Sequence, residues 1–445
     1  MMPDFEKEME RFSKAFDHTP ESEHSEQAIT LGIERARSKA KRNRRMLQVA
    51  TVAAAVILLF FSSVKISPAF AAYVAKLPGL NQIVFLINGD RGLKDAVNHH
   101  ALQQLNLSET KGRTTFTINS MIADQNQMIL FYTIRNPGKN GIFAMSKIDV
   151  KNTSGESVMG HAGLDSDAPT KKNSVVHQRL TISFKNNKLT DPLYLSIRRN
   201  AVSWRFTIPF DIKKFERMKK SYPIHQTAVL QGQKINFESM TIYPTRIAIR
   251  VKYDPNNTKK ITALDDLRIV DGNGHQWKPI VNGLESSEIN SNEQILYFQS
   301  NYFSEPKSLY LMMTHARAID KNMRNVVVDP VKKKLMKKPK DGWLTLKSIQ
   351  TVKDRMDETR KDQIVTLSLR WPKRDANIGY QIFASTFTDQ TGKTFTLRGM
   401  GTAMIGDTRN DLQLIIADRK YKGPLTFKII DYPSRIYGNV RIKIK

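Results

Sequence analysis

The sequence predicts a mainly β protein with one transmembrane helix, a short helical cytoplasmic tail and an extracellular array of three immunoglobulin-like β-sandwich repeats. Two patterns carry this prediction: an uncharged apolar stretch at residues 46–64, and a strand-and-turn pattern that recurs three times after it. The 445 residues contain no cysteine, so disulfides cannot hold the array together. Packing alone must stabilise it, which is typical of a bacterial surface protein.

The first 45 residues are expected to form the cytoplasmic helical tail. Phe5, Met9, Phe12 and Phe16 follow one another at i, i+4, i+7 and i+11, which is one stripe of an α-helix. A tail this short can hardly bury a core of its own, so the stripe needs a partner. Because residues 1–34 carry nine acidic and only three basic side chains, an anionic membrane surface would repel this striped helix, and a groove on another protein is favoured. In the alternative, two tail helices pack only on each other or stay partly unfolded.

Residues 46–64 are predicted to be the transmembrane helix, because they carry no charge over a length that spans the hydrocarbon core of a bilayer. Five basic residues lie between positions 39 and 45, directly before this stretch. The positive-inside rule therefore puts the N-terminus in the cytoplasm and the C-terminus outside the cell, with the protein in the cell membrane. A cleaved signal peptide is the competing interpretation, but the segment ahead of the apolar run is too long for one.

Residues 65–110 are expected to be a juxtamembrane helical segment. Pro68, Pro78 and Gly79 interrupt its first half. Apolar residues then recur at helical spacing within Gly89–Leu107, at Leu93, Ala96, Val97 and Leu102. This pattern predicts a short helix between the membrane and the first sandwich.

Three repeats are predicted at residues 111–211, 232–327 and 341–445. Each begins with a strand that carries a serine anchor, namely Ser120, Ser239 and Ser348. A second strand follows, with alternation typical of a half-buried strand. A turn then ends in glycine, at Gly155, Gly274 and Gly392, where a positive φ is expected. About 100 residues of short strands per unit favour an immunoglobulin-like sandwich. Lysine-rich segments at 212–231 and 326–340 are expected to be linkers.

The formal net charge of +28 indicates attraction to an anionic partner. The excess is spread along the chain after the apolar stretch, so we expect no direct binding of nucleic acid by one recognition helix. An anionic cell-wall polymer fits better, and a solvated basic surface without a partner is the alternative. No zinc-protease, phosphate-loop, nucleophile-elbow or dinucleotide pattern occurs. We therefore expect a protein that is not an enzyme, with no catalytic residue, no metal site and no cofactor.

The residues around the apolar stretch resemble a known family. The basic run before it, the Ser67–Leu80 segment after it, and the segments Gly89–Val97 and Met128–Ile134 are similar to Gram-positive membrane-bound regulators of extracytoplasmic-function sigma factors. This resemblance implies an anti-sigma factor whose tail holds a sigma factor through Phe5, Met9, Phe12 and Phe16. It also implies cleavage near the membrane, with a possible cleavage zone at Ala69, Phe70, Ala71 and Ala72. The tail lacks the zinc-binding His/Cys pattern of one anti-sigma class and is shorter than a four-helix anti-sigma domain.

Two functions are therefore expected from the sequence. The first is a single-pass membrane regulator, an anti-sigma factor whose ectodomain senses an envelope signal. The second is a non-enzymatic surface protein whose sandwiches bind anionic wall polymers, with an incidental tail. Sigma-factor binding by the tail discriminates between them.

Overall fold

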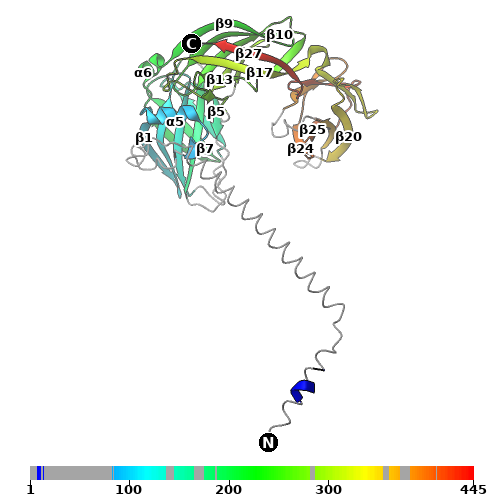
Figure 1. Ribbon diagram of the computed structural model, residues 1–445, viewed down its shortest axis with the longest axis horizontal. Helices are drawn as coiled ribbons and strands as arrows, with labels where there is room; N and C mark the ends of the chain where they lie inside the picture. Colours follow the sequence, from blue (N-terminus) through cyan, green and yellow to red (C-terminus); the bar gives the residue numbers. More distant parts are fainter. Residues whose placement is uncertain are drawn as a thin grey trace. The chain divides into compact units, whose positions relative to one another are not determined.

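The computed structural model confirms a mainly β protein built from antiparallel sheets (Figure 1). The chain divides into two units, Met1–Lys76 and Leu77–Lys445. The structure describes residues 8–11, 14, 83, 85–136, 145–164, 175–185, 188–280, 286–353, 360–370, 381–406 and 408–445. Within these residues no helix has the length and apolar character to cross a bilayer. The stretch at 46–64, predicted to be the transmembrane helix, lies outside them.

The first sandwich consists of a five-stranded and a three-stranded sheet. Their strand orders are β1-β2-β3-β6-β5 and β4-β7-β8. If β2 is taken as strand A, these are the A-B-E-D and C-F-G sheets of an immunoglobulin constant-type domain, with β1 added beside A. Strand bounds are β1 (Gln103–Lys111), β2 (Thr114–Ala123), β3 (Gln127–Arg135), β4 (Lys147–Lys151), β5 (Met159–Leu164), β6 (Val175–Phe184), β7 (Leu193–Arg199) and β8 (Val202–Ile208).

The second sandwich repeats this arrangement with one strand from far along the chain. One sheet has the order β15-β16-β11-β10-β9, and the other has the order β12-β17-β13-β14 with β27 on the free edge of β17. Strand bounds are β9 (Lys220–Leu230), β10 (Gln233–Ile242), β11 (Ile247–Tyr253), β12 (Lys259–Ala263), β13 (Arg268–Asp271), β14 (Gln276–Trp277), β15 (Ser286–Asn290), β16 (Glu293–Phe298), β17 (Leu309–Asp320) and β27 (Arg435–Lys443).

The third sandwich has the sheet orders β20-β21-β25-β24 and β19-β18-β26-β22-β23. Strand bounds are β18 (Asn325–Asp329), β19 (Lys334–Lys337), β20 (Leu344–Lys353), β21 (Lys361–Arg370), β22 (Phe383–Thr388), β23 (Thr394–Thr396), β24 (Gly399–Met404), β25 (Arg409–Ala417) and β26 (Leu425–Ile429). The remaining described elements after residue 90 are helix α5 (Arg91–Asn98), helix α6 (Ile212–Arg217) and the 3-10 turn η2 (Lys321–Met323).

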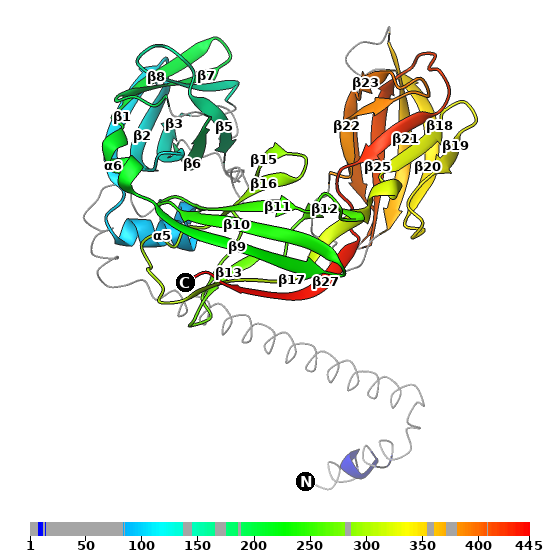
Figure 2. The same ribbon diagram turned by 90° about the horizontal axis from the view of Figure 1, so that it is seen from above.

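The second and third sandwiches exchange their last strands. In the first sandwich, strand F (β7) pairs with the next strand along the chain, β8, which is strand G. In the second, strand F is β17, but its G-side partner is β27. In the third, strand F is β26, but its G-side partner is β18, which follows β17 in sequence. Figure 2 shows β27 returning to lie along β17. Each sandwich is therefore completed by the strand that follows the F strand of the other.

The connection after strand F explains where strand G goes. In the first sandwich, Arg199 pairs with Val202, so only two residues separate the strands, and Asn200 adopts a φ of 54°. Such a two-residue turn forces a hairpin. After β17 the chain instead enters the 3-10 turn η2, and β26 is followed by a five-residue link (430–434) before β27. Neither connection returns the chain to the strand that it has just left.

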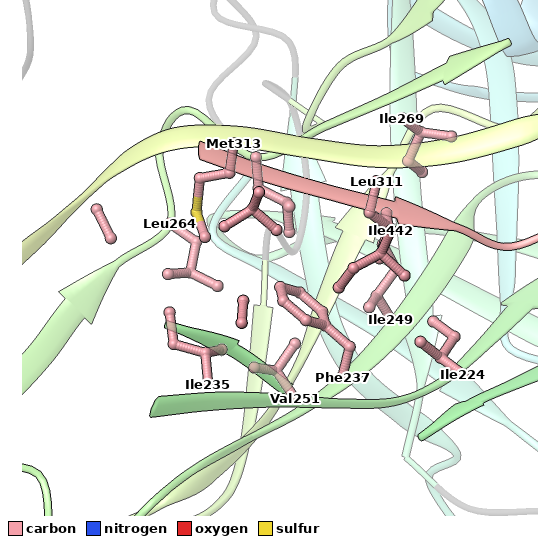
Figure 3. Close-up of a cluster of buried hydrophobic side chains, with 14 of the residues drawn as sticks. Ile224, Ile235, Phe237, Ile249, Val251, Leu264, Ile269, Leu311, Met313 and Ile442 are labelled. Carbon is pink, nitrogen blue, oxygen red and sulfur yellow. The ribbon is translucent and has the colours of Figure 1, made fainter. Parts of the chain in front are cut away.

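The exchanged strands contribute to the cores of the sandwiches that receive them. Ile436, Val440 and Ile442 of β27 pack in the core of the second sandwich. Figure 3 shows Ile442 among Phe237, Ile249 and Leu311. Val326 and Val328 of β18 pack in the core of the third sandwich. Burial of these aliphatic side chains, each worth roughly 1.5–3 kcal/mol, attaches both strands to their hosts.

The anchors that predicted the three repeats have the same structure in each copy. Ser120, Ser239 and Ser348 each follow a register shift in the pairing between strands A and B, that is, a β-bulge. The turn glycines have φ values of 78° at Gly155, 80° at Gly274 and 81° at Gly392, which confirms the expected positive φ. Each of these glycines donates its N–H to the backbone carbonyl three residues earlier, at Asn152, Asp271 and Asp389.

Strand pairing draws the repeat boundaries differently from the sequence pattern. Of the segment at 212–231, expected to be a linker, residues 212–217 form α6 and 220–230 form β9, whose Ile224, Ala228 and Leu230 are buried. Residues 326–340, also expected to be a linker, contain most of β18 and all of β19. Strands β9 and β18 alternate between buried apolar and more exposed residues, but the many lysines of these segments made them resemble linkers in the sequence. The first sandwich likewise begins with β1 at Gln103, inside the range assigned to the juxtamembrane segment.

Candidate functional site: the docked helix α5

The tail residues predicted to bind a partner are described only in part. Residues 8–11 are helical, and Met9 is 63% exposed. The Glu10 carboxylate and the Lys14 ammonium lie 4.0 Å apart as an i, i+4 pair. Phe5, Phe12 and Phe16, and the possible cleavage zone at 69–72, lie outside the described residues. Met9 is thus a large apolar side chain at the surface of the described helix.

Helix α5 follows an earlier helix, of which residues 83, 85 and 86 are described. Asp90 is its N-cap, and its carboxylate accepts a hydrogen bond from the Leu93 N–H at 3.0 Å. The buried residues Gly92, Leu93, Ala96 and Val97 form one face of the helix. The spacing of these apolar residues had predicted a helix in this range, and α5 lies within it. Its buried face needs a surface to pack on.

Helix α5 docks on residues 299–304 of the second sandwich, about 200 positions later in the chain. The Gln299 side-chain amide donates to the Gly89 carbonyl at 3.0 Å, and the Ser304 hydroxyl donates to the Asp95 carboxylate. Gly92 lies so close to Ser300 that an added Cβ would come within 2.5 Å of the Ser300 backbone. Only glycine therefore lets the helix approach this segment so closely.

Two ring contacts reinforce the docking of α5. The imidazole of His99 stacks on the Phe303 ring, with centroids 5.5 Å apart. The Arg91 guanidinium lies 5.2 Å from the centre of the Trp277 ring, which is fully buried in the second sandwich. Trp277 and Trp204 are both core residues, in the second and first sandwiches respectively. Contacts at both ends of α5 thus attach it to the second sandwich.

Polar contacts also join the first and second sandwiches. Asp124 is fully buried in the turn between β2 and β3, and its carboxylate accepts from both the N–H and the hydroxyl of Thr245. Buried Arg246 lies 4.0 Å from the centre of the Tyr297 ring and donates to the Ser183 hydroxyl at 3.5 Å. The sequence analysis missed these residues, since a single aspartate in a turn does not indicate its distant partner.

The Asp90 carboxyl is the titratable group of this site whose pKa is shifted. Asp90 keeps some surface at the solvent, but the surrounding protein desolvates its carboxyl and raises its pKa. The hydrogen bond from Leu93 and the positive charge of Arg179 oppose this shift. The folded state therefore holds the proton to a higher pH than the unfolded state, and stability falls as pH rises through the folded pKa.

Substitutions of Asp90 are expected to separate its capping role from its charge. Asp90→Asn keeps a capping oxygen but cannot ionise, so it should unfold at the same temperature as wild type or higher, with the advantage growing as the pH rises above about 4. Asp90→Ala loses the cap and should be destabilised by about 1 kcal/mol. Thermal unfolding as a function of pH measures both effects. Parallel pH profiles for the wild type and Asp90→Asn would contradict the role of the buried charge.

No group of three or more potential metal ligands gathers among the residues that the structure describes. His99 and His100, adjacent in the sequence, are both exposed at the C-terminal end of α5. Docking of a helix is the interaction that the described residues of this site show.

Comparison with known protein families identifies a matching region that begins before the apolar stretch and continues into the first sandwich. Residues 41–136 match "Domain of unknown function (DUF4179)", and residues 219–347 match "Family of unknown function (DUF5643)". The second match includes β18 and β19, which the third sandwich uses, and ends before β27. No curated protein matches the chain.

Two solved structures show weak similarity. One is "The crystal structure of the conserved domain protein from Bacillus anthracis", with 15% identity, a TM-score of 0.36, and coverage of 53% of this chain and 84% of that chain. The other is "Crystal structure of domains A168-A170 from titin", with 10% identity, a TM-score of 0.14, and coverage of 76% of this chain and 96% of that chain. The chain is thus similar to two domain families of unknown function, the first of which is associated with anti-sigma-factor-like membrane proteins.

Proposed function

We propose that this protein is a single-pass membrane regulator of the anti-sigma-factor type. Its tail holds an extracytoplasmic-function sigma factor in the cytoplasm, and its sandwiches sense an envelope signal outside the cell. The observation that carries the proposal is the match of residues 41–136 to a domain associated with anti-sigma-factor-like membrane proteins. This match extends from the basic flank, across the uncharged stretch at 46–64, to the end of β3.

Helix α5 supplies a physical route for a signal in this proposal. The chain that leaves residues 46–64 enters the ectodomain through α5, which hydrogen bonds and ring contacts attach to residues 299–304. A rearrangement of the second sandwich that disturbs this segment would release α5. Release would change the strain or exposure of the chain near the membrane, where Ala69, Phe70, Ala71 and Ala72 form the proposed cleavage zone.

The tail carries the binding function in this proposal. Phe5, Met9, Phe12 and Phe16 would insert into a hydrophobic groove of the sigma factor, as amphipathic helices do in helix-in-groove complexes. The 63% exposure of Met9 agrees with an apolar stripe available to a partner. Blocking such a groove would keep the sigma factor from RNA polymerase.

A pull-down with the full-length protein tests the proposal. Phe12→Glu combined with Phe16→Glu is expected to abolish capture of the cognate sigma factor, because two carboxylates replace the centre of the apolar stripe. Lys7→Gln combined with Lys14→Gln is the matched control, since it changes the net charge by the same amount on the opposite helix face. Capture that persists in the stripe variant, or is lost equally in both variants, would refute binding through the stripe.

A further inference from the structure

The outer face of the β4-β7-β8 sheet in the first sandwich carries a hollow with strongly basic walls. Its volume is about 370 Å³, and side chains of all three strands line it. Four of these side chains are cations: Lys147 and Lys151 of β4, Arg198 of β7 and Arg205 of β8. The hollow is remote in sequence from the docked helix and has no role in the proposed regulation.

Strand register arranges these side chains in rows across the sheet. Lys147 pairs with Arg198, Ser196 pairs with both Asp149 and Arg205, and Lys151 pairs with Tyr194. Successive rows are two residues apart, or about 7 Å at the usual rise of a β-strand. Cations therefore recur along the hollow at about 7 Å, a repeat that suits a linear polymer with regularly spaced anions.

The cations of the hollow form no ion pairs among the described residues, whereas Lys111 pairs with Glu109 and Lys188 pairs with Glu156 elsewhere in this sandwich. One further carboxylate is nearby: Glu109 accepts a hydrogen bond from the Arg205 backbone N–H, and the Arg205 charge helps to lower the pKa of Glu109. The one carboxylate in the lining, Asp149, accepts a hydrogen bond from the Ser157 hydroxyl at 2.6 Å. The lining thus holds four positive charges and one negative charge, a net charge of +3, which favours an anionic ligand.

An exposed aromatic ring, that of Tyr194, lies beside Lys151 in the lining. Tyr194 is 45% exposed, and no cation covers its ring among the described residues. Its counterpart in the second sandwich is Tyr310, because both tyrosines follow the first leucine of an F strand. The ring of Tyr310 is covered, since the Arg441 guanidinium lies 4.6 Å from its centre. The face of Tyr194 is left available for the apolar side of a sugar or polyol.

We propose that this hollow binds a linear phosphodiester-linked polyol or sugar polymer. Arg198 and Arg205 each offer a guanidinium fork that matches phosphate oxygens, and Lys147 and Lys151 add point charges to adjacent phosphates. Tyr194 packs against the carbon chain between two phosphates. A neutral polysaccharide lacks the anions, and a single phosphate monoester fills only one row, so neither should bind well.

The test measures binding of full-length protein in neutral detergent to fluorescent poly(glycerol phosphate) by anisotropy. Arg198→Glu combined with Arg205→Glu is expected to weaken binding by about tenfold or more at low ionic strength, and salt should weaken wild-type binding. Tyr194→Ala should weaken binding several-fold with no change in charge. Lys213→Glu combined with Lys214→Glu, on exposed positions of α6, is the matched control and should retain binding.

The outcomes separate the proposal from general charge attraction. Equal loss in the two charge-reversal variants would show that only the overall charge matters, and would overturn it. So would an absence of wild-type binding, or binding of neutral dextran equal to that of poly(glycerol phosphate). Competition by phosphatidylglycerol micelles that exceeds competition by free polymer would assign the face to a lipid surface instead. Circular dichroism of each variant verifies that the fold is intact.

Discussion

Replacing Ile442 with aspartate is expected to unfold the second sandwich while the third stays folded. Ile442 lies in β27, pairs with Leu311 of β17 and is buried in the core of the second sandwich. A carboxylate there would be buried without a partner, at a cost of several kcal/mol, on top of the lost aliphatic burial. That sum is comparable with the whole stability of a typical domain, about 5–15 kcal/mol.

Hydrogen exchange resolved by peptide is the measurement for this variant. Peptides from β9 to β17 should lose protection, whereas peptides from β20 to β26 should keep it. Asn439→Asp is the matched control, because it adds the same charge to an exposed position of the same strand and should leave both sandwiches protected. If Ile442→Asp instead exposed the third sandwich, the assignment of β27 to the second would be wrong.

Val328→Asp is expected to have the reciprocal effect. Val328 follows the strands of the second sandwich in sequence, but it pairs with Leu425 of β26 and is fully buried in the third core. An unpaired charge at this position should therefore unfold the third sandwich by the same mechanism, with a similar loss of several kcal/mol. The amide hydrogens of peptides from β20 to β26 should exchange rapidly. Those of peptides from β9 to β17 should exchange more slowly.

Asn325→Asp is the control for this second variant, since Asn325 lies exposed at the start of β18. Loss of protection in the second sandwich alone would mean that β18 belongs to it and that the strands are not exchanged. Limited proteolysis of the same variants gives an independent measurement, because each unfolded sandwich would be cut within its own sequence range.

The strand exchange bears on how the proposed regulator could transmit a signal. The second and third sandwiches each contain a strand that the chain connects directly to the other. A disturbance of the third sandwich is therefore transmitted to β17 or β27 in the second. The second sandwich in turn holds α5 through Gln299, Ser300 and Ser304. The three sandwiches are thus connected to α5 by strand pairing and hydrogen bonds as well as by the chain itself.

The amino-acid sequence by itself determined the local features of this protein. Alternation of period two predicted β11 and β21, the turn glycines predicted the positive φ at Gly155, Gly274 and Gly392, and the spacing of Leu93, Ala96 and Val97 predicted a helix in the range of α5. Each of these features depends on residues close together in the chain, so the sequence pattern is sufficient to indicate it.

Only the tertiary structure decided which strands and surfaces meet. Strands β18 and β27 both alternate and both follow an F strand, so nothing within either strand says which sandwich receives it. The surface on which α5 docks lies about 200 residues away, and the basic hollow combines strands from two separate parts of the first sandwich. Such pairings depend on the complementarity of surfaces that are far apart in the sequence, and those surfaces form only when the chain folds.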